Sequence, residues 1–166
     1  MKFGATPIDE ATGAILAHSW RAKGISFSKG RRLSGEDVSR LKAAGADSIV
    51  AARLEPDDIH EDQAAETVAR ALAGKGIEVT APFTGRCNHF ASEAGLAVVD
   101  HERIDALNEL DESVTVATLA PYARVTPRQM VATVKIIPYA APRAAVQRAL
   151  DVAKSANQPL ISVAPF

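Results

Sequence analysis

The stretch 48-SIVAARLEPDDIHEDQAAETVARALAGKGIEVTA-81 decides the fold. Its first seven residues, 48-SIVAARL-54, are typical of a strand. A helix is then predicted, because Asp58 can act as its N-cap, Glu61 occupies the capping-box position and Gly74 can end it. Its apolar residues recur at helical spacing: Ala64, Ala65, Val68, Ala69 and Leu72. The last residues, 77-IEVTA-81, alternate between apolar and polar, so the stretch predicts a small β-α-β unit.

The residues before this stretch predict two strands and a short helix. The segments 14-AILAHSW-20 and 25-ISFS-28 have strand character and are joined by a turn that Gly24 favours. Ser34 is followed three residues later by an acidic residue, which is the pattern of a helix N-cap. The helix that it begins is expected to end near Gly45.

The residues after Pro82 predict short strands around one small helix. Strands are expected at 96-LAVV-99, 114-VTVATL-119 and 130-MVATVKII-137, with a helix capped by Asp100 between the first two. Pro142 suits the first turn of a last helix, which 160-LISV-163 follows as a strand. The predicted class is therefore α+β, with a small β-α-β N-terminal part, a β-rich, barrel-sandwich-like part and a C-terminal helix. The predicted parts are an α+β subdomain at 1–81, a β-rich subdomain at 82–141, and a helix with a linker strand at 142–166.

The composition of the 166 residues is that of an ordinary globular protein. Apolar residues make up 47% and charged residues 23%, and no apolar run is long enough to span a bilayer. The net charge is −1, and basic and acidic residues are interspersed along the chain. This gives no reason to expect nucleic acid or a membrane surface as a partner. The N-terminal residues MKFGATPIDE do not resemble a signal peptide, and one cysteine cannot form an internal disulfide. These features predict a cytoplasmic protein.

The segment 82-PFTGRCNHFASEAG-95 gathers residue types that enzymes use, and it reads as a loop between Pro82 and Gly95. A structural metal site needs four ligands, whereas this chain has one cysteine and four scattered histidines, so no metal site is predicted. Cys87 is interpreted as a partly buried thiol beside a solvated imidazole, that of His89. Arg86 and Asn88 are the expected ligand or interdomain contacts, because together they can orient an anionic group.

A second polar cluster, 57-DDIHEDQ-63, surrounds His60 with carboxylates. Acidic residues in a first helical turn favour the helix dipole, and this explains part of the cluster without any ligand. His60, Glu61 and Asp62 remain candidate site residues, with Glu61 or Asp62 a candidate partner for Arg86. No catalytic residue is assigned.

The segment 123-ARVTPRQMVATVKII-137 resembles half of the barrel-sandwich of biotinyl and lipoyl carrier domains. Such domains present their modified lysine at a hairpin tip, whereas Lys135 stands inside a predicted strand. The resemblance therefore implies a similar architecture more than a swinging-arm function.

Six stretches taken in order resemble the N-terminal half of a bacterial MoeA-like, molybdopterin-binding protein family. They are 9-DEATGAILAHS-19, 29-KGRRLSGEDVSRLKAAG-45, 52-ARLEPDDIHEDQAA-65, 84-TGRCNHFASEAGLAVVD-100, 106-ALNELDESVTVATLAPYARV-125 and 129-QMVATVKIIPYA-140. In that family this half precedes a domain similar to those that bind molybdopterin during molybdenum-cofactor biosynthesis. The binding domain is marked by a glycine-rich GGTG-type loop beside acidic residues, and this sequence has no such loop.

The resemblance implies an accessory, non-catalytic domain that assists molybdenum-cofactor handling or docks a partner domain. No cofactor is expected on this half; molybdopterin is expected on a C-terminal companion domain of the same chain, with 159-PLISVAPF-166 as the linker toward it. The sequence is also compatible with a homo-oligomer of this chain. One alternative is a small-molecule, sugar-acid-like enzyme module that uses the loop with Arg86 and His89, together with His60 and Asp62. A further alternative is a carrier domain of the biotinyl or lipoyl type.

Overall fold

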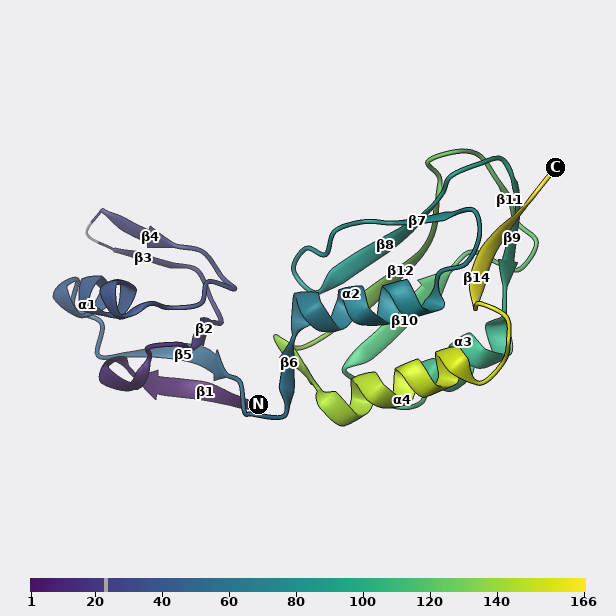
Figure 1. The fold of residues 1–166 in the computed structure, drawn as a ribbon. Helices are drawn as coiled ribbons and strands as arrows, with labels where there is room; N and C mark the ends of the chain where they lie inside the picture. The colour runs from purple at the N-terminus through teal and green to yellow at the C-terminus, as the bar shows by residue number, and fades with distance from the viewer. Residues whose placement is uncertain (23) are drawn as a thin grey trace. The chain divides into compact units, whose positions relative to one another are not determined.

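The computed structural model describes residues 1–22 and 24–166, and they form two compact units, Met1–Asp58 and Ile59–Phe166 (Figure 1). The units divide between Asp58 and Ile59, whereas the predicted boundary stands at 81/82. The observed boundary lies closer to the N-terminus because the helix α2 (Glu61–Leu72) packs on strands that follow it in the sequence. It therefore belongs to the second unit.

The first unit is built on a three-stranded antiparallel sheet with the order β1-β5-β2. Its core gathers Leu16, Phe27, Leu41 and Ile49. Strands β3 and β4 form a hairpin, but the strand predicted at 14–20 is divided: Ile15–Leu16 form β2, which pairs with β5, and only Trp20–Ala22 pair with β4. Its elements are β1 (Lys2–Pro7), the 3-10 helix η1 (Ile8–Glu10), β2 (Ile15–Leu16), β3 (Trp20–Ala22), β4 (Ile25–Phe27), α1 (Gly35–Ala43) and β5 (Ser48–Arg53).

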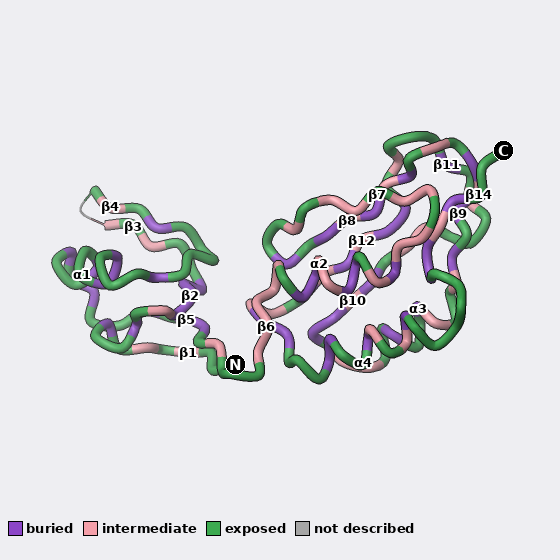
Figure 2. The backbone as a smooth tube through the Cα atoms, viewed as in Figure 1, coloured by how far each residue is buried: buried purple, intermediate pink, exposed green. Residues whose placement is uncertain are grey.

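The second unit contains a four-stranded antiparallel sheet with the order β10-β12-β8-β7, a three-stranded sheet β11-β9-β14 and the pair β13-β6. Its core lies between α2, α4 and these sheets, where Val68, Leu72, Val134 and Ile161 are buried (Figure 2). Its elements are β6 (Asp58–His60), α2 (Glu61–Leu72), β7 (Ile77–Val79), β8 (Arg86–Ala91), β9 (Gly95–Val99), α3 (His101–Asn108), β10 (Val114–Thr118), β11 (Arg124–Val125), β12 (Met130–Ile136), β13 (Ala140–Pro142), α4 (Arg143–Lys154) and β14 (Ile161–Pro165).

The predicted α+β class is confirmed, with four helices and several small antiparallel sheets and no closed barrel in the described residues. The expected β-α-β unit is wrong in its pairing. β5 pairs with β1 and β2, and β7 pairs with β8, so the two strands that flank α2 lie in different sheets. None of the helices in the described residues is long and apolar enough to cross a membrane.

Two of the three predicted N-caps are correct. The Ser34 side chain accepts from the Asp37 N–H, and Asp100 accepts from the Arg103 N–H, each at 3.1 Å. The N-cap of α2 is His60 instead of Asp58, because strand pairing with β13 keeps the chain extended as far as His60. The Asp58 carboxylate accepts from the Glu55 N–H at 2.8 Å and takes no part in the helix.

Candidate functional site

The central part of the predicted loop at 82–95 is a strand. Residues Arg86–Ala91 form β8, which lies between β12 and β7 in the four-stranded sheet. Burial alternates along it, since Cys87, His89 and Ala91 are buried. Arg86 and Asn88 lie on the opposite face, where Arg86 is exposed. The period of two is that of a strand with one face on a core, and polar residue types had concealed it.

His89 lies in the core and not in solvent, which corrects its interpretation as a solvated imidazole. Its side chain is 0% exposed, and Nε2 lies 2.8 Å from the carbonyl oxygen of Ala69. Ala69 belongs to the last turn of α2, where carbonyl groups have no partner within the helix. The Nε2–H tautomer therefore donates to the helix end and ties α2 to the sheet.

The charge state of His89 follows from its burial. Burial lowers the pKa of the imidazole below its ordinary value, and the Ala69 carbonyl and the Ala132 backbone only partly oppose this shift. The Ala132 backbone does not form a hydrogen bond with the imidazole, so His89 Nδ1 has no hydrogen-bond partner among the described residues. A neutral, enclosed imidazole that binds a helix carbonyl has a structural role.

Cys87 is also part of the core. It is fully buried, and its Sγ donates to the Thr80 carbonyl oxygen at 3.0 Å. Burial raises the pKa of this thiol, which disfavours the thiolate that a nucleophile or metal ligand requires. Among the described residues, no three His, Cys, Asp or Glu side chains come together as a metal site.

The other side of β8 faces away from the helix that packs on this sheet. α2 contacts β8 and β12 on the core side (Figure 1), whereas Arg86 and Asn88 share the opposite side with residues of β10 and β12. In register, Thr115 pairs with Lys135 and Lys135 with Arg86, while Thr133 pairs with Asn88. We call the residues Arg86, Asn88, Thr115, Thr133 and Lys135 the Arg86 face.

Hydrogen bonds and like charges organise the Arg86 face. The Thr133 hydroxyl donates to Asn88 Oδ1 at 2.7 Å, and the Thr115 hydroxyl donates to the Lys135 carbonyl oxygen at 3.1 Å. Arg86 and Lys135 are directly opposed on neighbouring strands, and like charges at such positions repel. Among the described residues, neither cation has an ion pair with a carboxylate, so this end of the face is positively charged.

The turn before β8 joins this face to the start of α2. Thr84 and Gly85 both have positive φ, 49° and 70°, as a two-residue hairpin turn requires. The Gly85 N–H donates to Asp62 Oδ1 at 2.6 Å, and Lys135 Nζ donates to the Thr84 carbonyl oxygen. A Cβ on Gly85 would lie 2.5 Å from Glu61 Oε2. The turn is therefore held by the acidic first residues of the helix.

The structure thus brings together only some of the predicted site residues. Glu61 and Asp62 do lie beside the segment that leads into Arg86, with Asp62 contacting the Gly85 backbone. His60 is used locally, since its Nδ1 accepts from the Asp62 N–H at 3.3 Å. His89 faces the core and is separated from Arg86 by the sheet itself.

Sequence reasoning missed that Thr115 and Thr133 belong to the same surface as Arg86. The signal for Thr133 was available, because in 130-MVATVKII-137 the residues two apart must share a face with Lys135. Nothing local indicated that β8 would be their neighbour, since the paired residues are distant in the chain.

Comparison with known proteins adds one finding. A family described as a domain of unknown function (DUF8806) matches residues 5–53, a segment inside the first unit. No curated protein and no solved structure matches the chain.

Proposed function

We propose that this chain is the accessory, non-catalytic part of a molybdopterin-binding protein and that the Arg86 face docks the companion domain. The carrying observation is the opposed pair of cations, Arg86 and Lys135, on a sheet face that α2 does not cover. A carboxylate of the docked domain that lies between Arg86 and Lys135 would offset the repulsion between these two cations.

Charge complementarity selects the occupant of the face. The resemblance to the MoeA-like family implies a companion domain whose glycine-rich loop stands beside acidic residues. Arginine offers a planar fork that binds a carboxylate through two N–H groups, and Lys135 adds a second positive charge. Asn88 and Thr133 add hydrogen-bonding groups at the centre of the surface. An acidic partner surface therefore suits this face better than an apolar or basic one.

A non-catalytic role is supported by where the reactive residue types lie. Cys87 and His89 are enclosed in the core and hydrogen bonded to backbone carbonyls. Arg86 and Asn88 offer binding groups, and the Thr133 hydroxyl and the Lys135 amino group beside them are each engaged in a hydrogen bond. In this proposal molybdopterin is bound by the companion domain, and the complete protein is cytoplasmic, with which the single free cysteine is compatible.

The two alternatives have less support. The enzyme module needs Arg86 and His89 in one cavity, and they lie on opposite sides of β8. The carrier domain needs an accessible lysine at a turn, whereas Lys135 lies within β12 and its amino group is bonded to the Thr84 carbonyl oxygen.

The proposal is tested by charge reversal. The coding sequence that follows Phe166 should first be read for a domain with a GGTG-type loop, and that domain produced separately. Its binding to this chain is then measured by calorimetry for the wild type, Arg86→Glu, Lys135→Glu and Lys154→Glu. Lys154 is an exposed lysine on α4, so it controls for the change in net charge. We expect roughly tenfold weaker binding for the first two variants only, and weaker wild-type binding at high salt.

Equal losses in all three variants would refute the Arg86 face as the docking surface. A second measurement addresses the accessory role itself: molybdopterin should bind the complete protein far more tightly than it binds this chain alone. Equal affinities would show that this chain holds the cofactor.

A further inference from the structure

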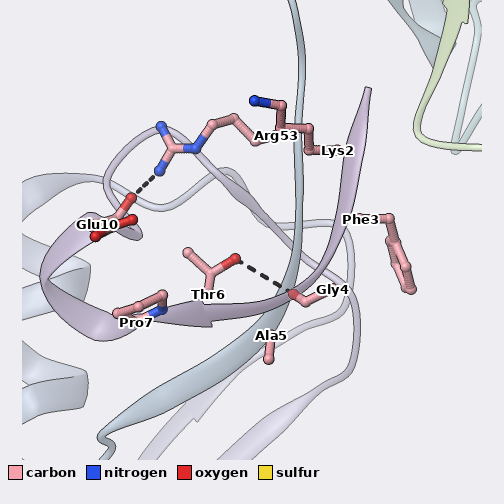
Figure 3. A pocket seen from close by; sticks show the side chains of 8 residues that line it. All are labelled: Lys2, Phe3, Gly4, Ala5, Thr6, Pro7, Glu10 and Arg53. Carbon is pink, nitrogen blue, oxygen red and sulfur yellow. Dashed lines mark hydrogen bonds between the residues drawn. The ribbon is translucent and has the colours of Figure 1, made fainter.

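The first unit contains a hollow of about 220 Å³ beside the edge strand β1 (Figure 3). Its walls come from β1, η1 and the end of β5. Phe3 points away from the other labelled side chains and leaves the polar ones on the inner side. The polar side chains lining the hollow are those of Lys2, Thr6, Glu10 and Arg53.

Two cations are opposed at this hollow. Lys2 pairs with Arg53 in the register of β1 and β5, so both side chains emerge on the same face of the sheet. Among the described residues, neither forms an ion pair with a carboxylate. An anion between them would relieve their repulsion.

Arg53 is held in position at the wall of the hollow. One of its terminal nitrogens donates to the main-chain carbonyl oxygen of Glu10, as Figure 3 shows. A guanidinium has five N–H donors, so this single bond leaves donors for a ligand. The Thr6 hydroxyl makes only a 3.4 Å contact to the Gly4 carbonyl oxygen and is free to turn toward a ligand.

We propose that this hollow binds the phosphoryl group of a small ligand. Two cations match the charge of about −1.5 to −2 on a phosphate monoester, whereas a carboxylate carries half of that. The hollow is smaller than pockets that enclose whole ligands, which begin at about 300 Å³. It therefore takes the phosphoryl group and leaves most of the ligand outside. This proposal does not depend on the Arg86 face.

Glu10 sets a limit on the affinity. Its side chain also lines the hollow, and a carboxylate there repels an anion. Replacing it by glutamine keeps the main-chain carbonyl that positions Arg53. Glu10→Gln should therefore tighten phosphate binding, which a site formed by surface cations elsewhere would not show.

The test is a titration of the full chain with inorganic phosphate at constant ionic strength, followed by backbone amide NMR shifts. Saturable shifts are expected at residues 2–10 and at Arg53. Lys2→Gln and Arg53→Gln should weaken binding roughly tenfold each. Arg21→Gln removes an exposed cation of the same unit and should leave binding unchanged. The Lys2 side chain makes no hydrogen bond or ion pair among the described residues, and Lys2→Gln keeps the main-chain pairing of β1 with β5, so this variant should fold.

Two comparisons distinguish the ligand source and the ligand class. Glycerol phosphate that binds more tightly than inorganic phosphate indicates a phosphorylated small molecule, and equal binding indicates free phosphate; either supports a phosphoryl site. Acetate at the same ionic strength should give much smaller shifts. Equal shifts with acetate, or an equal loss in Arg21→Gln and Lys2→Gln, would overturn the proposal.

Discussion

The two faces of strand β8 carry polar side chains that meet opposite requirements. On the core face, Cys87 and His89 are fully buried and each is bonded to a backbone carbonyl oxygen. On the other face, Arg86 has no ion pair among the described residues and Asn88 is bonded to Thr133 across the sheet. The residues most typical of an active site are thus part of the framework, and the surface available for binding is made by arginine, asparagine and lysine.

Of the substitutions on the two faces of β8, His89→Ala should have the largest effect on stability. Removing this side chain leaves a cavity in the core and the Ala69 carbonyl without its donor, and together these should lower the free energy of unfolding by about 3 kcal/mol. Chemical denaturation monitored by circular dichroism measures it. A loss below about 1 kcal/mol would mean that His89 does not join α2 to the sheet.

The pH dependence of stability should reveal the same histidine. Burial lowers the pKa of His89 in the folded state, so below about pH 6.5 the unfolded chain binds a proton that the folded chain does not. Its contribution to stability is therefore complete above pH 6.5 and is lost as the pH falls toward the folded pKa. The slope for one proton cannot exceed about 1.4 kcal/mol per pH unit. Denaturation curves between pH 5 and pH 7 measure it.

A matched variant makes this test specific. His101 is an exposed histidine at the start of α3, so His101→Gln should keep the slope, whereas His89→Gln should remove it. The carboxylates paired with Arg31 and Arg103, Asp37 and Asp100, have lowered pKa values and act in the same direction. Their contribution is lost only as the pH falls below about 4, outside this window.

On the opposite face, Asn88→Ala should have a smaller effect. It removes the hydrogen bond from the half-buried Thr133 hydroxyl, and water can replace that partner, so a loss of about 1 kcal/mol is expected. The denaturation measurement is the same. A double variant with Thr133→Val should lose little more than Asn88→Ala alone, and fully additive losses would contradict the proposed coupling.

The smallest effect is expected for Arg86→Ala. An exposed side chain without an ion pair contributes little to folding, so the change in stability should stay within about 0.5 kcal/mol. A loss of several times this size would make Arg86 part of the framework and would remove the contrast between the two faces.

The sequence alone predicted features that depend on neighbouring residues. The capping box of Ser34 and Asp37 and the cap at Asp100 each join groups three residues apart, so the sequence contains the whole interaction. The strands predicted at 48–54 and 130–137 are found at 48–53 and 130–136, because their apolar residues are dense enough to indicate burial. Arg86, Asn88 and Lys135 were noted by their chemistry, although not as one surface.

Only the tertiary structure decided how the segment 82–95 is used. Its polar residues are typical of a loop, but pairing with β12 and β7 makes Arg86–Ala91 a strand and assigns their side chains to its two faces. The decisive partners are distant: Ala69 is 20 residues from His89, and Thr133 is 45 residues from Asn88. A buried imidazole is tolerated because a helix end supplies an acceptor, and no pattern local to His89 shows where that helix will end. The strand pairing that keeps the chain extended to His60 likewise overrode the local signal at Asp58, because β13 lies some 80 residues further along the chain.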